Sequence, residues 1–196
     1  MKKAAQAHGN GLAGRQVRRC PLKCFFSNMI GIVGIVSVGC STPSLFPPEA
    51  IRDTAPLQFG VLEAKPDVFK GRVVQLAGRI VGIERSAEGI LIRAQELPLA
   101  RNPGSGPVEL VKGTPEFAII YPGKVDEKAL WFWNKFVVVG LAQGSHTIHV
   151  DGVSHTAPYV VARCIHIWKT GSYRIEDYPH LTDGYYPLEH QTYCAN

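Results

Sequence analysis

The stretch that decides the fold is a β-branched run with two internal glycines, Arg72-Val73-Val74-Gln75-Leu76-Ala77-Gly78-Arg79-Ile80-Val81-Gly82-Ile83-Glu84. β-Branched residues are enriched in strands, so this run predicts one long strand. Gly78 and Gly82 lie inside it, and a glycine within a strand often marks a bulge or a tight bend. We therefore expect a strongly bent strand of the kind that turns a barrel corner.

Four further β segments follow this run. We expect them at 89–97, 117–121, 136–142 and 159–168, with one or two helical turns at 125–134 and a polar loop or hairpin at 143–152. No apolar period of 3.6 residues is sustained long enough for a major helix, so the body is predicted to be all-β. This order predicts an OB-fold-like five-stranded barrel with a short helical segment between strands 3 and 4, and a small sandwich is the alternative.

The chain begins with a basic stretch, followed by an uncharged apolar run that ends at Cys40. This layout is typical of a secretory signal. The run is shorter than the ~20 apolar residues that a spanning helix needs, so a retained transmembrane anchor is the less favoured alternative.

The end of that run, Ser37-Val38-Gly39-Cys40, resembles a bacterial lipobox. In such signals the cysteine thiol receives a diacylglyceryl group and the peptide is cut before it. Ser37 departs from the usual Leu at the first position, whereas Val38 and Gly39 fit. We expect lipidation at Cys40, and two or three acyl chains would hold the protein on a membrane without a spanning helix. Ser41 is not the Asp that marks inner-membrane retention, which favours the outer membrane.

The basic charge of the whole sequence lies mostly in this signal. The formal net charge is +5, but residues 1–39 hold six of the 21 basic residues and no acidic one. From Cys40 onward, 15 basic residues therefore face 16 acidic ones. A near-neutral body lacks the electrostatic footprint of a duplex binder, so no nucleic-acid partner is expected.

We divide the chain into four parts. They are a lipoprotein signal peptide at 1–39, an acylated cysteine with a Pro-rich tether at 40–64, a β domain at 65–170 and a Tyr-rich C-terminal tail at 171–196. Residues 41–56 are rich in Pro and small polar residues, which favours an extended spacer. The tail has no apolar period, so we expect a loose segment that lies on the domain or reaches a partner.

Five cysteines are reduced to two by this division. Cys20 and Cys24 precede the apolar run and Cys40 is the lipidation candidate, which leaves Cys164 and Cys194. In an oxidising compartment these two could form a disulfide, and a buried free thiol is equally ordinary.

The chain resembles the Slp family of Gram-negative outer-membrane lipoproteins, the starvation-inducible lipoproteins, over roughly residues 65–170. The resemblance is carried by residues 69–81, 96–99, 135–140 and 158–168. It implies an envelope lipoprotein with no assigned enzymatic activity.

Several side chains suggest chemistry that a plain structural interpretation explains as well. His146, His149 and His155 crowd one region, and Cys164 and His166 share a strand face, but the spacings match no strong metal motif. Adjacent carboxylates at 126 and 127 do not form the facing pair that glycoside hydrolysis needs. We therefore predict no catalytic residues, no metal and no cofactor.

Trp131, Phe132, Trp133 and Phe136 form the densest aromatic group. They could plug one end of the barrel, which we favour, or Trp131 and Trp133 could stack on a sugar or base. The leading interpretation is a non-enzymatic lipoprotein facing the periplasm, acting in envelope maintenance or stress adaptation through contacts with envelope proteins or a ligand. The alternative is a binding module for an oligosaccharide or a metal ion.

Overall fold

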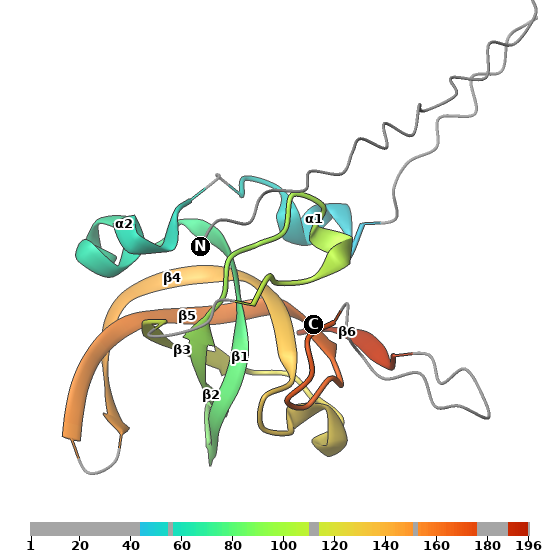
Figure 1. Ribbon diagram of the computed structural model, residues 1–196. Coiled ribbons are helices and arrows are strands. Elements are labelled where there is room, and N and C mark those ends of the chain that lie inside the picture. The colour runs from blue at the N-terminus through green and yellow to red at the C-terminus, as the bar shows by residue number, and fades with distance from the viewer. Residues whose placement is uncertain (1–43, 55–56, 110–113, 151–152, 176–187, 196) are drawn as a thin grey trace, which may run out of the picture. The chain divides into compact units, whose positions relative to one another are not determined.

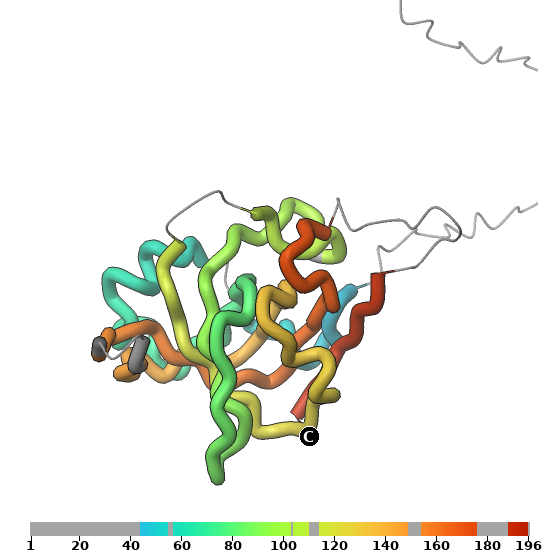
Figure 2. Tube along the Cα trace, turned by 60° about the horizontal axis from the view of Figure 1, so that its bottom comes forward, coloured from blue at the N-terminus to red at the C-terminus, as the bar shows by residue number. Residues whose placement is uncertain are grey.

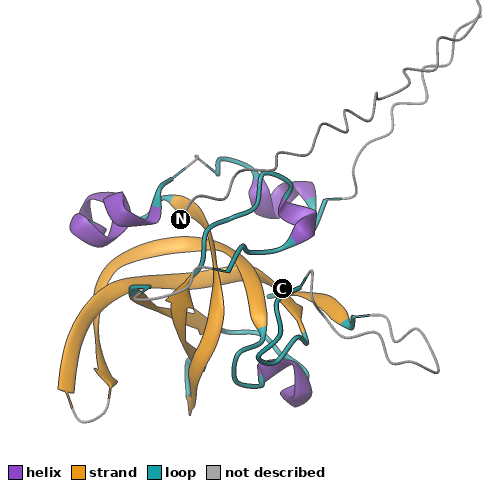
Figure 3. Ribbon diagram, viewed as in Figure 1, coloured by secondary structure: helices purple, strands orange, loops and turns teal. Residues whose placement is uncertain are grey.

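A computed structural model of the chain describes residues 44–54, 57–109, 114–150, 153–175 and 188–195. The strands are β1 (Val73–Ser86), β2 (Gly89–Glu96), β3 (Glu116–Tyr121), β4 (Lys135–Val150), β5 (Val153–Trp168) and β6 (His190–Cys194). The short helices are α1 (Pro48–Ile51), α2 (Phe59–Ala64) and the 3₁₀ segments η1 (Pro66–Phe69), η2 (Pro103–Ser105) and η3 (Glu127–Leu130). Figure 3 shows the strands forming the body, with the helices around its outside.

The long strand β1 changes partners along its length. Residues 73–79 pair with β4, and residues 78–86 pair with β2. A register shift lies between Ile80 and Gly82, which confirms the predicted bulge. A Cβ on Gly78 would lie 2.5 Å from the backbone oxygen of Gln95, so only glycine lets the two strands approach this closely at the corner.

The strands close into a ring. The sheet order is β3-β2-β1-β4-β5-β6, and residues 118–120 of β3 also pair in parallel with residues 159–161 of β5. Segment η3 lies between β3 and β4 in the chain (Figure 1). This is the pairing of a five-stranded Greek-key OB barrel. The predicted all-β, OB-fold-like barrel with a short helical segment between strands 3 and 4 is therefore confirmed.

The barrel interior is filled by side chains that alternate inward along the strands. The fully buried ones include Ile80, Ile92, Phe117, Ile119, Phe136, Val138 and Ile165. The Phe117 ring lies 5.4 Å from the Phe59 ring and 6.2 Å from the Phe136 ring, centroid to centroid. Tilted aromatic contacts of this kind add to the apolar burial that stabilises the core.

Strands β4 and β5 are longer than the sequence pattern suggested. Of the two alternatives expected at 143–152, the polar hairpin is confirmed and the loop is wrong, because antiparallel pairing of the two strands continues to Val150 and Val153. Ile148 supplies the reason, since it is buried against Ala118 and Ala157 and gives this polar arm an apolar face.

The N-terminal lead also differs from the extended spacer expected at 41–56. Residues 44–51 pack on the outside of the barrel, where Phe46 and Ala50 are buried with Val137, Val139 and Trp168. Pro48 occupies the first helical turn of α1, a position that proline favours. This Pro-containing segment therefore forms a short helix and not an extended spacer, because Phe46 and Ala50 pack against the outer wall of the barrel.

The C-terminal end forms a sixth strand. Residues 190–194 pair antiparallel with residues 164–168 of β5, and β6 lies at the margin of the barrel (Figure 2). The loose tail expected after residue 170 is therefore wrong for its last described segment. Its polar residues give no apolar period because the strand lies at a sheet edge.

Candidate functional site

The predicted lipidation residue Cys40 lies outside the described residues, as does the signal at 1–39. The first described residue is Ser44, which leads into the packed segment before α1. Among the helices of the described ranges, none has the length and apolar character needed to cross a membrane.

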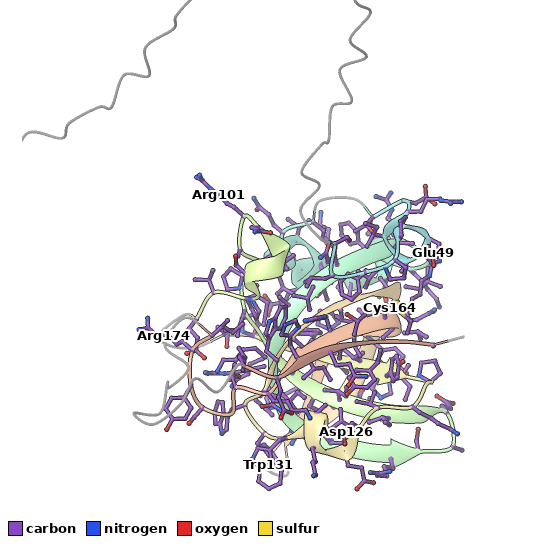
Figure 4. The ribbon with its side chains drawn as sticks, turned by 90° about the vertical axis from the view of Figure 1, so that its right-hand side faces the viewer. Glu49, Arg101, Asp126, Trp131, Cys164 and Arg174 are labelled. Atoms are coloured by element: carbon purple, nitrogen blue, oxygen red, sulfur yellow. A yellow bond between two sulfur atoms is a disulfide. The ribbon has the colours of Figure 1, made fainter. Side chains whose placement is uncertain are left out.

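The turn between η3 and β4 exposes three consecutive aromatic side chains. Trp131 is 69% exposed, Phe132 52% and Trp133 42%. We call these three residues the aromatic surface. The plug favoured from the sequence is wrong for them, because η3 contributes Ala129 and Leu130 to the core and β4 contributes Phe136. Figure 4 shows Trp131 projecting outward from one end of the barrel.

Backbone hydrogen bonds fix this turn to β1. Trp133 N donates to Ile80 O at 2.9 Å, and Ile80 N donates to Asn134 O at 3.0 Å. The buried Asn134 side chain donates to Ala129 O at 2.9 Å and accepts from Gly171 N at 2.8 Å. The turn is therefore held on both sides, and its exposed rings project from a well-anchored backbone.

Trp133 adopts a backbone conformation that large side chains rarely take. Its φ is +69°, in the left-handed region, which costs an L-residue with a side chain roughly 1–2 kcal/mol. Such outliers persist where surrounding structure over-determines them, and they cluster at functional sites. Here the hydrogen bonds to Ile80 impose the conformation.

Planar polar side chains lie beside the Trp133 ring. The guanidinium carbon of Arg79 is 4.6 Å from the ring centroid, a cation–π contact. Arg79 Nε donates to Gln95 Oε1 at 2.9 Å, and its Nη1 lies 3.8 Å from Glu109 Oε1. The site thus combines aromatic faces with a short row of hydrogen-bonding groups.

A buried lysine, Lys135, contacts Glu109 in this row of polar side chains. Lys135 is 1% exposed, and its Nζ lies 3.1 Å from Glu109 Oε1. It also donates to the carbonyl oxygens of Gly171, at 3.1 Å, and Tyr173. A buried ammonium group needs such partners to offset its lost hydration. Lys135 therefore fixes Glu109 and the segment after β5 against the start of β4.

On another part of the barrel, β6 is bound to β5 by covalent and polar contacts. A disulfide joins Cys164 to Cys194. His166 Nδ1 lies 2.6 Å from Thr192 Oγ1, which in turn donates to Leu45 O at 2.9 Å. β6 thus connects the barrel wall to the N-terminal lead that follows the candidate anchor.

His166 is held in its neutral form. It is buried, its Nε2 lies 3.1 Å from His190 Nδ1, and the Trp168 ring lies edge-on at 4.3 Å between centroids. Burial, and secondarily the neighbouring His190, lower the pKa of His166 from 6.5 to about 4. The group contributes packing and polar contacts to the junction of β5 and β6.

Of the other histidines considered in the sequence, His146 and His155 have described side chains. His146 stacks on Tyr159 at 4.8 Å between ring centroids, and His155 is exposed on β5. The side chain of His149 is not among those described. Within the described ranges, no three His, Cys, Asp or Glu side chains gather closely enough to hold a metal ion.

The adjacent carboxylates at the start of η3 have separate partners. Asp126 Oδ1 accepts from Lys128 N at 3.1 Å, and its Oδ2 pairs with Lys169 at 3.1 Å. The backbone hydrogen bond from Lys128, followed by that from Lys169, lowers the pKa of Asp126. Glu127 pairs with Arg85 at 2.6 Å. They form a capped, ion-paired turn and no facing acid–base pair.

A cleft of about 330 Å³ lies between the α2 segment and the barrel. It is lined by Leu57, Gln58, Phe59, Gln75, Leu76, Ala77, Glu96, Leu97, Pro98 and Leu99. Burial, and to a smaller extent the charge of Glu63, raise the pKa of Glu96. Most of the residues that line the cleft are apolar.

Arg79 and Gln95 were not identified from the sequence as site residues. Both occupy positions in strands where an ordinary surface side chain is expected. Their contact with Trp133 depends on how the turn before β4 docks on β1, a long-range pairing that no local motif signals. The exposure of Trp131 depends on the same docking.

Comparisons with known proteins identify the family of the chain but no ligand for it. The family model described as "Outer membrane lipoprotein Slp family" matches residues 38–194. A crystal structure of the small single-stranded DNA-binding protein from Streptomyces coelicolor matches with 15% sequence identity and a TM-score of 0.32, covering 49% of this chain and 93% of that one. No curated protein matches the chain.

Proposed function

The chain belongs to the outer membrane lipoprotein Slp family, and on this basis we propose that lipid on Cys40 anchors it and that it maintains the envelope or adapts it to stress without catalysing a reaction. Its place is the outer membrane of a Gram-negative envelope. The proposal assigns the protein a role exerted through contacts with envelope components.

The observation that carries the anchor is the N-terminal limit of the family match. The match begins at residue 38, two residues before Cys40, and excludes the basic stretch. This limit agrees with cleavage before Cys40, where the lipobox predicts it. Cys40 would then be the first residue of the mature protein.

The packed lead supports a barrel held close to the lipid. Ser44 is four residues after Cys40, and an extended chain spans at most about 3.6 Å per residue, so the two lie within about 14 Å of each other. From Ser44 the chain is bound to the barrel through Phe46, α1 and the Leu45–Thr192 hydrogen bond. Little freedom remains for the barrel to move away from the membrane surface.

The packing of α1 also distinguishes two sides of the described barrel. α1 packs on the outer wall formed by β1, β4 and β5, and Glu49 of α1 and Trp131 lie on opposite sides of the molecule (Figure 4). An anchor near α1 would place the membrane on the α1 side. The aromatic surface would then face the periplasm, where it is available to envelope components.

Membrane fractionation of a cysteine variant tests this proposal. We expect the wild type in the outer-membrane fraction and Cys40→Ser as an uncleaved precursor that does not reach it. Cys24→Ser, which changes a cysteine within the predicted signal, should behave as the wild type. Cys40→Ser in the outer membrane at the wild-type level would contradict the lipid anchor.

A further inference from the structure

We propose that the aromatic surface is a carbohydrate-binding site, with the rings of Trp131 and Trp133 stacking on sugar rings and the Arg79–Gln95–Glu109 row binding their hydroxyl groups. The inference deepens the proposed function and rests on it for the location of the glycan. The binding chemistry itself follows from the described residues.

The first step is that neither the turn nor the filling of the barrel end requires the exposed rings of Trp131 and Trp133. Contiguous exposed apolar side chains on a soluble surface mark interaction sites. The turn is already fixed through Asn134 and Ile80, and the barrel end is filled by Leu130 and Phe136. Trp131 and Trp133 are therefore available for a ligand, and binding would require little ordering of the backbone.

The second step is the polar row beside the rings. Sugars offer an apolar face of C–H groups and a rim of hydroxyls, so a site for them needs aromatic faces next to a few fixed donors and acceptors. Glu109 Oε1 forms ion pairs with Lys135 and Arg79. Gln95 Oε1 accepts a hydrogen bond from Arg79. For Glu109 Oε2 and Gln95 Nε2 the described residues supply no hydrogen-bond partner, which leaves one acceptor and one donor for hydroxyl groups.

The third step separates a sugar from a nucleic acid. Exposed bases also stack on aromatic rings, but single-strand binders combine them with a positively charged groove. Here Arg79 and Lys135 both face the carboxylate of Glu109, and the chain from Cys40 onward carries one more acidic than basic residue. A phosphate backbone would find little positive charge.

The fourth step separates a sugar from the membrane. Tryptophans can anchor a protein at the lipid interface. Trp131 and Glu49 of α1 lie on opposite sides of the described barrel (Figure 4), and α1 begins eight residues after Cys40. With a lipid on Cys40, Trp131 would point away from the membrane that holds the protein.

Co-sedimentation with purified peptidoglycan sacculi tests the inference, using the full chain purified in detergent. We expect the wild type to sediment, soluble N-acetylglucosamine oligomers to compete, and Trp131→Ala and Trp133→Gly each to weaken binding about tenfold, the loss of one stacked ring. Val68→Ala, which shortens an apolar side chain that is 63% exposed in η1, should bind as the wild type. Unchanged thermal melting of Trp131→Ala shows that its loss is local.

Three results would overturn the inference. They are failure of the wild type to sediment, retention of binding in both tryptophan variants, and equal or tighter ring-dependent binding to oligo(dT) or to phospholipid vesicles. Because purified protein is used, these results are independent of the Cys40→Ser fractionation. Failure of the carbohydrate site and failure of the lipid anchor can therefore be told apart.

Discussion

The guanidinium of Arg79 lies over the ring of Trp133, with 4.6 Å between its central carbon and the ring centroid. The two residues are far apart in sequence, and they meet because the turn before β4 forms backbone hydrogen bonds with Ile80. This docking places Trp133 beside a charged row and leaves the side chain of Trp131 69% exposed. The aromatic surface therefore depends on a strained turn held by β1.

Replacing Trp133 tests that strain. Trp133→Gly and Trp133→Ala both remove the ring and the Arg79 contact, but only glycine adopts φ +69° without a steric penalty. We expect Trp133→Gly to be more stable than Trp133→Ala by about 1 kcal/mol in the free energy of unfolding, measured by urea denaturation. An alanine variant as stable as the glycine variant would mean that the turn is unstrained.

Removing the Lys135 ammonium group should be costly. Lys135→Met keeps most of the side-chain volume but leaves Glu109 and two carbonyl groups without their cation. We expect a loss of about 3 kcal/mol or more in unfolding free energy, since the remaining charge is partly buried.

The matched control is the exposed ion pair between Arg85 and Glu127. Arg85→Met should cost less than about 1 kcal/mol, because surface pairs contribute little. If the two methionine variants unfolded at the same urea concentration, Lys135 would not have the supporting role assigned to it.

The bond between Cys164 and Cys194 should stabilise the fold. It closes a loop with a sequence separation of 30 residues, and the chain-entropy relation gives about 3.6 kcal/mol for such a loop. Dithiothreitol should lower the urea midpoint of the wild type and leave a Cys164→Ala/Cys194→Ala variant unchanged. Two free thiols in protein taken directly from the envelope would contradict the disulfide.

Acidification should destabilise the fold through His166. Its pKa falls from 6.5 in the unfolded chain to about 4 in the folded protein, so the unfolded state binds more protons between these values. Its contribution to stability is complete above pH 6.5 and is lost as the pH falls toward 4, by about 3 kcal/mol in total.

A comparison of variants isolates this effect from other titrating groups. The difference in unfolding free energy between the wild type and His166→Gln should shrink as the pH falls from 6.5 to 4. His155→Gln, at an exposed position, should run parallel to the wild type. Parallel curves for wild type and His166→Gln would show that His166 is already protonated or exposed.

The barrel itself was predictable because its signals are local. Gly78 and Gly82 interrupt a β-branched run, and β1 bends and bulges there as expected. Strand order followed from segments with strong β propensity, such as the one that begins at Phe136. The full length of the pairing between β4 and β5 was not predicted, because Ile148 is the one buried apolar side chain among residues 143–148 and gives no detectable period.

The surroundings of the barrel were not predictable, because tertiary contacts decide them. Phe46 and Ala50 lie among prolines that suggest an extended spacer, yet they find an apolar wall at Val137 and Val139. β6 has no apolar alternation and is held by Cys164 and by polar partners. Aromatic density identified Trp131 as unusual, but exposure depends on how its turn docks.

The lipid on Cys40 is the central claim, and mass spectrometry of the mature N-terminus tests it most directly. The protein should be purified from the outer-membrane fraction and its N-terminal peptide analysed intact. We predict a chain that begins at Cys40 and carries the mass of a diacylglyceryl group with or without a further acyl chain. A soluble periplasmic protein with an unmodified N-terminus, or a membrane-bound chain that retains residues 1–39, would contradict it.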